Sequence, residues 1–169
     1  MATGGPDWER RLSDLWASIG DRSEADFLAS MNELTGELPP DSGIGIFERA
    51  ASFDSTGHPD LAVALYRQAL DLGLTGERRR RAVIQLASSL RNLGQPQVSV
   101  ALLTAELDVG SDHLDDAVRA FLALALVDTG KEREAVSVAL TALAPHLPRY
   151  QRSLATYAGL LTTGPSATP

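Results

Sequence analysis

The sequence predicts an all-α fold, an α-solenoid built from antiparallel helix pairs. Four glycines, Gly20, Gly57, Gly94 and Gly130, lie 37, 37 and 36 residues apart, and a fixed period of this size is typical of helical repeat arrays. Aromatic residues make up only 5% of the chain, which is rich in alanine and leucine, and this composition favours helices over sheet. Between the glycines, apolar residues recur at three- and four-residue spacing, as on one face of a helix.

The first predicted unit covers residues 7–36 and contains two helices. Pro6 suits the start of the first helix, and we expect Gly20 to end it. Ser23 is the predicted N-cap of the second helix, because its hydroxyl can accept a hydrogen bond from a free backbone N–H group. Gly36, followed closely by two prolines, ends this helix.

The second and third predicted units cover residues 42–74 and 79–109. In the second unit, a helix from about Ser42 to Thr56 is followed by a turn at Gly57 and by a second helix. The third unit begins with a long amphipathic helix, Arg78 to Gly94, which contains four consecutive arginines. Gly57 and Gly94 are each followed two residues later by a proline, which is tolerated in the first turn of a helix.

The fourth predicted unit covers residues 112–146, with Ser111 as the cap of a helix that runs to Thr129. A ninth helix, within residues 149–162, should cap the array at its C-terminal end. We expect residues 1–5 and 163–169 to be flexible tails, because they are rich in small residues and prolines. The whole chain, residues 1–169, is predicted to form a single domain.

The charge and composition exclude several classes of protein. The net charge is −7, which argues against nucleic acid or an anionic membrane as a partner, because both require a basic surface. Without cysteine, the chain has no disulfide and no thiolate metal site. No apolar run approaches the ~20 residues that a membrane-spanning helix needs. We therefore expect a cytoplasmic protein.

The repeat pattern resembles the tetratricopeptide repeat (TPR) family, and in particular short stand-alone bacterial TPR proteins. That family places small residues where paired helices approach and large ones where pairs stack. The resemblance extends over residues 7–146, although the period is longer than the ~34 residues of that family. The matching positions of the last three units are Ala50, Phe53, Gly57, Ala62, Tyr66, Ala69; Val83, Leu86, Ala87, Leu90, Gly94, Ser99, Leu103; and Leu122, Ala123, Leu126, Gly130, Ala135, Ala139, Ala142.

The resemblance implies a right-handed superhelix whose first helices line a concave groove that binds a peptide or a helix of a partner protein. The groove residues implied by position are Phe47, Asp54, Arg81, Gln85, Ser88, Arg91, Asn92, Leu124 and Asp128. Relatives that bind chaperone C-termini hold the terminal carboxylate with lysine and asparagine. The matching positions here contain no cation, so that clamp is absent; they are Phe47, Ala51, Gln85, Ala117 and Phe121.

The four arginines, Arg78 to Arg81, allow two interpretations. Successive residues of a helix are about 100° apart, so the four side chains cannot all face one way. They form either a solvated helix start or a partly functional cluster. In the functional interpretation, Arg81 faces the groove with Arg91 and Asn92 and binds an acidic partner, because the guanidinium group matches a carboxylate in a bidentate contact.

We predict neither catalysis nor a cofactor. Thr129-Gly130-Lys131 lacks the upstream glycine of a P-loop, and no nucleophile motif is present. Asp112, His113, Asp115 and Asp116 are close enough in sequence to suggest a metal site. However, acidic residues are also favoured in the first turn of a helix by its dipole. The spacing of the three histidines matches no metal-binding motif.

The predicted function is that of a non-catalytic protein–protein interaction module or scaffold. The alternative is a structural homo-oligomer, such as a homodimer, in which the groove or the end helices associate with a second copy. The aromatic pairs Trp8/Trp16 and Tyr150/Tyr157 bear on this alternative, because each pair lies on one helical face near one end of the array. They either pack against the array or form an exposed patch that requires a partner.

Overall fold

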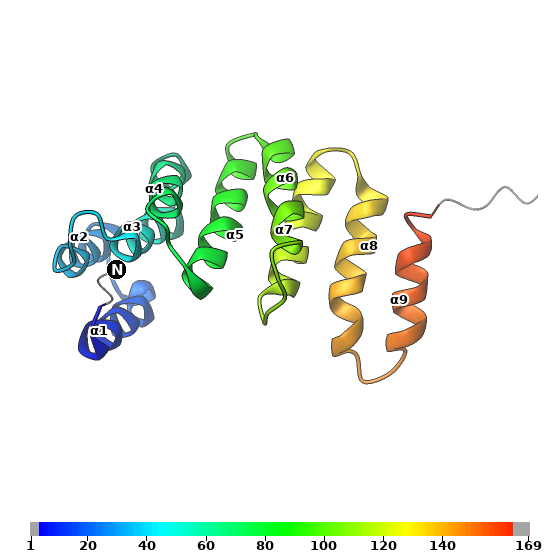
Figure 1. Ribbon diagram of the computed structural model, residues 1–169, viewed down its shortest axis with the longest axis horizontal. Helices are drawn as coiled ribbons and strands as arrows, with labels where there is room; N and C mark the ends of the chain where they lie inside the picture. The colour runs from blue at the N-terminus through cyan, green and yellow to red at the C-terminus, as the bar shows by residue number, and fades with distance from the viewer. Residues whose placement is uncertain (1–3, 164–169) are drawn as a thin grey trace, which may run out of the picture. The chain divides into compact units, whose positions relative to one another are not determined.

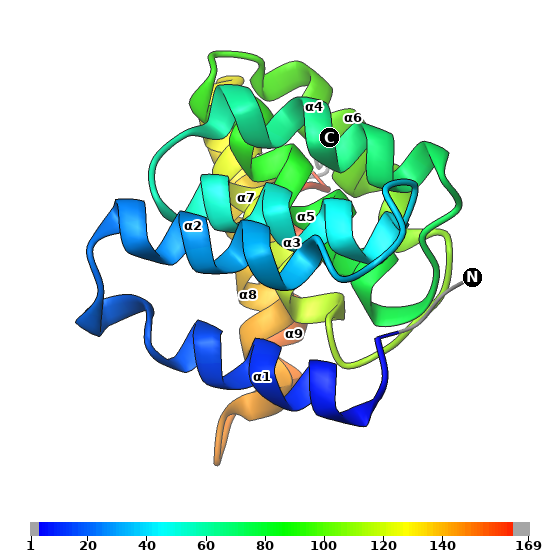
Figure 2. The same ribbon diagram turned by 90° about the vertical axis from the view of Figure 1, so that its left-hand side faces the viewer.

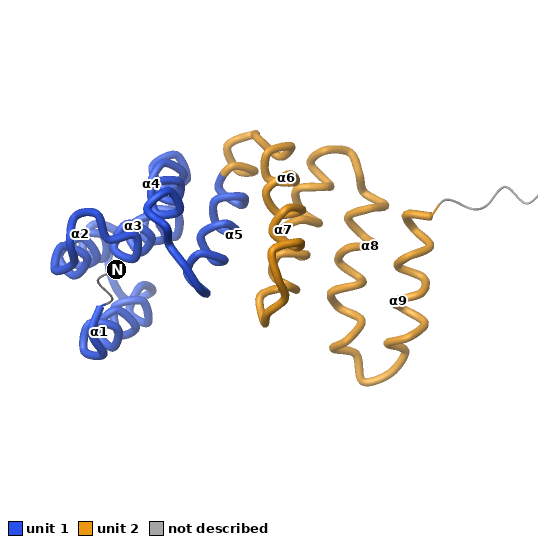
Figure 3. Tube along the Cα trace, in the orientation of Figure 1, with its two compact units in different colours: residues 1–89 blue, residues 90–169 orange. Residues whose placement is uncertain are grey.

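The computed structural model describes residues 4–163, and within this range it contains nine α-helices, two short 3-10 helices and no strand (Figure 1). The all-α prediction is confirmed. The chain divides into two compact units, residues 1–89 and 90–169, and the boundary falls inside one helix (Figure 3). The predicted flexible tails fall mostly on residues 1–3 and 164–169, outside the described residues. None of the described helices is both long enough and apolar enough to span a membrane.

The helices of the first unit begin close to the predicted positions. The N-cap prediction for Ser23 is confirmed, because its hydroxyl accepts a hydrogen bond from the Asp26 N–H (3.2 Å). The Ser42 hydroxyl accepts one from the Gly45 N–H (3.3 Å) in the same way. The elements are α1 (Pro6–Ala17), η1 (Ile19–Asp21), α2 (Glu24–Thr35), α3 (Gly43–Ser55), α4 (Pro59–Asp71) and the first part of α5 (Gly76–Asn92). Gly20 lies inside η1, so the first helix ends earlier than predicted.

The pair α1–α2 has its own apolar core. It contains Trp8, Leu12, Leu15, Phe27, Met31 and Leu34. The indole N–H of Trp8 donates to the carbonyl of Leu34 (2.8 Å), which satisfies the polar atom of a side chain that is only 4% exposed. Trp16 packs edge-on against Phe27, with the ring centroids 5.3 Å apart. The two tryptophans therefore pack inside the first unit.

In the pair α3–α4, small residues lie where the two helices touch, and large residues fill the space that remains. Ala50, Ala62 and Ala69 are fully buried, and their small side chains let the two helices approach closely. The buried rings of Phe47 and Tyr66 fill the remaining space, with their centroids 6.1 Å apart. Figure 2 shows α2, α3 and α4 running side by side.

Three of the four periodic glycines, Gly57, Gly94 and Gly130, follow the C-terminal end of a helix and have a positive φ. Gly57 and Gly94 have φ angles of 87° and 76°, a left-handed conformation that only glycine adopts readily. After each of them, a backbone N–H bonds back to the helix: His58 to Phe53 (2.9 Å) and Gln95 to Leu90 (2.9 Å). This repeated bond pattern is the physical basis of the period in the sequence.

In the second unit, α6 packs on α7, α7 on α8, and α8 on α9 (Figure 1). The elements are α6 (Pro96–Leu107), α7 (Asp115–Asp128), α8 (Glu132–Leu143), η2 (Ala144–His146) and α9 (Gln151–Leu160). The prediction that Ser111 caps α7 is wrong, because the helix starts at Asp115. The Ser111 hydroxyl instead donates to the Asp115 carboxylate (2.6 Å), and Asp112 accepts a bond from the Leu114 N–H (2.7 Å).

Candidate binding surface

A buried carboxylate, Glu48 on α3, anchors the start of α5. Glu48 is 1% exposed, and its two oxygens accept hydrogen bonds from Arg78 Nε (2.9 Å) and Trp16 Nε1 (3.0 Å). Arg78 also binds both oxygens of Glu9 on α1, at 3.0 and 2.6 Å. Burial alone would lower the pKa of Arg78, but the bonds to Glu9 and Glu48 raise it above its ordinary value. Arg78 thus connects α1, α3 and α5 and is not part of a solvated helix start.

Arg81, one turn further along α5, lies over an aromatic ring. Its guanidinium carbon is 5.3 Å from the centroid of the Phe47 ring, within the range of a cation–π contact. Phe47 is fully buried. Its assignment to a partner-binding groove is therefore wrong, because its side chain belongs to the core between α3, α4 and α5. Among the described residues, no carboxylate forms an ion pair with Arg81, so its hydrogen-bond donors are available to a ligand.

Gln85 continues the same face of α5, four residues after Arg81. Its Oε1 atom is buried and accepts no hydrogen bond within the described part of the chain. A buried acceptor without a donor is unfavourable by about 1–3 kcal/mol. Ser88, which lies on the same face as Arg81 and Gln85, is half-buried. The face therefore carries the guanidinium group of Arg81 and, one turn later, a buried amide oxygen without a donor.

Asp54 on α3 has partners on both carboxylate oxygens. Ser89 donates to Oδ1 (2.8 Å), and the hydroxyl of Tyr66 donates to Oδ2 (3.3 Å). Partial burial raises the pKa of Asp54, and the two hydroxyl donors act in the opposite direction. Asp54 therefore joins α3, α4 and α5 within the first unit, and a partner would have to compete for its oxygens.

The raised pKa of Asp54 predicts a specific pH dependence. The folded protein binds this proton more tightly than the unfolded chain does, so the contribution of Asp54 to stability falls as the pH rises from 3.8 to the raised pKa. We expect the free energy of unfolding of wild type, minus that of Asp54→Asn, to decrease across this window when both are measured by urea denaturation. Asp60→Asn, an exposed change on α4, is the matched control. A difference that grows with pH would contradict the expectation.

The remaining predicted site residues lie in the second unit. The structure brings two of them together as an ion pair, with Arg91 Nε 2.6 Å from Asp128 Oδ2, so neither is free for a partner without breaking the pair. Asn92 is exposed. Leu124 and its neighbour Val127 are 47% and 48% exposed on α7 and form a short apolar stripe. The predicted groove spans both units and stays a prediction.

The acidic cluster before α7 has a structural explanation. Its carboxylates accept hydrogen bonds at the start of the helix, and Asp116 is bound by His146 (2.8 Å) and Arg119 (3.0 Å). The hydrogen bond from His146 is the main cause that lowers the pKa of Asp116. Within residues 4–163, no group of three or more His, Cys, Asp and Glu residues could hold a metal ion.

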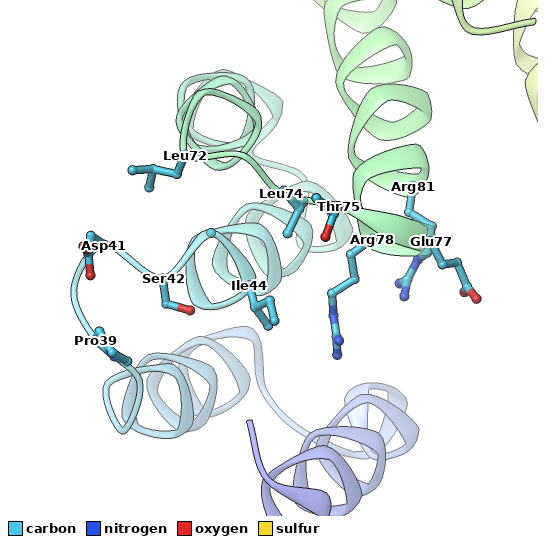
Figure 4. Close-up of a pocket in the computed structure, with 11 residues that line it drawn as sticks. Pro39, Asp41, Ser42, Ile44, Leu72, Leu74, Thr75, Glu77, Arg78 and Arg81 are labelled. Carbon is cyan, nitrogen blue, oxygen red and sulfur yellow. The ribbon is translucent and has the colours of Figure 1, made fainter. Parts of the chain in front are cut away.

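One pocket that sequence reasoning missed opens beside Arg81, inside the first unit (Figure 4). Its volume is about 620 Å³. It is lined by the link between α2 and α3 with the start of α3, by the end of α4 with the α4–α5 link, and by the first turns of α5. The sequence gives no signal for this pocket, because its residues belong to three separate segments that only the packing brings together.

The helix pairs, the small residues at their contacts and the repeated glycine C-caps define an α-helical repeat protein. In comparison with known proteins, residues 43–161 match the family model described as Tetratrico peptide repeat. The chain belongs to the tetratricopeptide repeat family, whose members are generally non-catalytic protein–protein interaction scaffolds. No curated protein and no solved structure shows a significant match to the chain.

Proposed function

We propose that the protein binds a peptide or a helix of a partner protein, and that Arg81 on α5 makes the decisive contact. The observation that carries this proposal is the guanidinium group of Arg81. Arg81 has no carboxylate partner within residues 4–163, and its guanidinium carbon lies 5.3 Å from the centroid of the Phe47 ring. An acidic polypeptide supplies the missing carboxylate for the guanidinium group.

The contact with Phe47 favours Arg81 as the main anchor. A guanidinium group held over a ring loses less rotational freedom on binding than a freely moving one, so more of the contact energy is available for affinity. Arginine is also enriched among the residues that dominate interface energies. The Arg91–Asp128 pair makes Arg91 a weaker candidate, since a partner carboxylate would have to displace Asp128.

The proposal predicts that Arg81→Glu reduces partner capture at least about tenfold, because it replaces an attractive charge contact by a repulsive one. Wild-type protein and the variant are each used as bait, and mass spectrometry quantifies the bound proteins. Calorimetry then measures the affinity of the most strongly captured protein. Arg67→Glu, an equal charge change at an exposed position on α4, is the matched control. Equal capture by wild type and Arg81→Glu would refute the role of α5.

Self-association is the second candidate function, and the last helix favours it. Tyr150, Tyr157 and Leu160 are 76%, 65% and 58% exposed, so the tyrosine pair does not pack against the array. Large apolar side chains gathered at the end of a repeat array are typical of a surface that another chain covers. Light scattering after size exclusion separates the two functions: a dimer lost in Tyr157→Asp but kept in Arg81→Glu would support self-association through α9.

A further inference from the structure

The charged and apolar side chains of the pocket beside Arg81 lie in different parts of it. Figure 4 shows Asp41 at one side, on the link between α2 and α3, and Arg81 at the other side, on α5. The apolar side chains of Ile44 and Leu74 lie between them, Leu72 lies on the side of Asp41, and Arg78 lies next to Arg81. The pocket thus has an anionic end, an apolar middle and a cationic end.

We propose that this pocket binds a segment of a partner polypeptide in which an apolar side chain lies between a basic and an acidic residue. The acidic residue contacts Arg81, the basic residue contacts Asp41, and the apolar side chain lies against Leu72 and Ile44. The inference rests on the proposed function, since it identifies the part of the partner that α5 holds. The pocket volume of about 620 Å³ falls within the range of about 300–1,000 Å³ found for binding sites of small ligands.

The charges that remain available in the pocket support this pattern. Arg78 lines the pocket, but its guanidinium group is already bound to Glu9 and Glu48. Glu77 also has a partner. Asp41 is exposed and, among the residues that the structure describes, forms no ion pair. The two charges open to a ligand are therefore one carboxylate and one guanidinium of opposite sign, and a ligand with both charges complements them.

The apolar middle of the pocket is partly open to solvent. Leu72 is 40% exposed at the C-terminal end of α4, whereas Leu74 beside it is only 7% exposed. Ile44 is half-buried and also packs on the core of α1 and α2. A ligand side chain that covers Leu72 would remove exposed apolar surface, which is favourable by about 25 cal/mol per Å².

The walls of the pocket are already fixed by contacts within the chain. The Ser42 N–H donates to the carbonyl of Pro39 (2.8 Å), and the Leu74 N–H donates to that of Ala69 (3.2 Å), so both links have a defined backbone. Gly43 packs tightly, because a Cβ atom there would lie 3.3 Å from the Ala69 carbonyl oxygen. The guanidinium group of Arg81 lies over the ring of Phe47, which fixes one side of the pocket. The backbone of both links therefore has little conformational entropy to lose when a ligand binds.

The test uses short fluorescent peptides in which a central leucine is flanked by lysine and glutamate at one-, two- or three-residue spacing. Matched peptides replace the glutamate, the lysine or the leucine by glutamine. Fluorescence anisotropy measures their affinity for the full-length protein and for Arg81→Gln, Asp41→Asn and Leu72→Gln. The control variants change the same residue types outside the pocket: Arg67→Gln, Asp60→Asn and Leu61→Gln. Circular dichroism verifies that each variant is folded.

We expect each pocket variant to weaken the best peptide about five- to tenfold, and each to lose its sensitivity to the matching change in the peptide. The control variants should bind like wild type. If the peptides bind through Arg81 but Asp41→Asn and Leu72→Gln have no effect, the pocket proposal is overturned while the proposed function stands. If no peptide binds while Arg81→Glu still loses a captured partner, the pocket proposal fails alone. If neither assay depends on Arg81, both fail.

Discussion

Replacing Arg78 with methionine is expected to lower the free energy of unfolding by about 3–5 kcal/mol, the usual effect of removing one partner of a buried ion pair. The physical reason is Glu48, which is 1% exposed and would keep only the Trp16 indole as a hydrogen-bond partner. Its charge would remain in a region that water cannot reach. Guanidinium denaturation followed by circular dichroism measures the loss.

Two further variants isolate the buried charge as the cause. Arg10→Met is the control, because Arg10 pairs with Asp7 on the solvent-exposed side of α1. An exposed ion pair of this kind contributes little to the free energy of unfolding. The double variant Arg78→Met with Glu48→Met removes both buried charges and should recover much of the lost stability. A double variant less stable than Arg78→Met would show that the charge of Glu48 is not the source of the effect.

Much of the fold was predictable because its determinants are local. The turn glycines need a left-handed backbone, and Gly57 and Gly94 have one. Ser23 and Ser42 cap helices whose free N–H groups lie within three residues of the cap. Signals of this kind are contained in a short stretch of sequence, so the repeat was visible without any knowledge of packing.

Prediction from the sequence failed at positions whose environment depends on residues far away in the chain. Phe47 occupies a position that corresponds to a groove residue in the family. In this protein α4 and α5 cover it, and its ring packs near Tyr66. Glu48 was not singled out by the sequence analysis, and it is 1% exposed. It is buried because Arg78, thirty residues away in the chain, reaches its carboxylate. Neither contact has a counterpart in the local spacing of apolar residues.

The start of α7 shows a third kind of failure, a competition between two local signals. Ser111 is a suitable cap, but it is followed by Asp112 and Asp115, whose carboxylates also accept backbone N–H groups. The carboxylates bind these donors, and the helix begins at Asp115. Serine and aspartate are about equally favourable at the N-cap of a helix. N-cap preference alone therefore could not predict whether Ser111 or one of the aspartates would accept the backbone N–H groups.

Truncating Phe47 to alanine is expected to have an equally large effect, a loss of about 3–5 kcal/mol in the free energy of unfolding. The ring is fully buried against Tyr66, and its removal leaves a cavity between α3, α4 and α5. The same change removes the surface on which the Arg81 guanidinium rests. Affinity for the proposed acidic partner should therefore fall as well, because Arg81 loses its fixed orientation. Thermal and chemical denaturation measure the first effect, and peptide binding measures the second.

Phe53→Ala separates these two effects. Phe53 is a half-buried phenylalanine on the same helix that packs edge-on against His58, with the ring centroids 6.3 Å apart, and it does not contact Arg81. Its truncation should destabilise the protein less than that of Phe47 and leave partner affinity unchanged under conditions where the protein is folded. Phe47→Leu fills most of the cavity but provides no ring for the guanidinium group. If Phe47→Leu binds the partner as tightly as wild type, the ring does not position Arg81, and its burial in the core is the whole of its role.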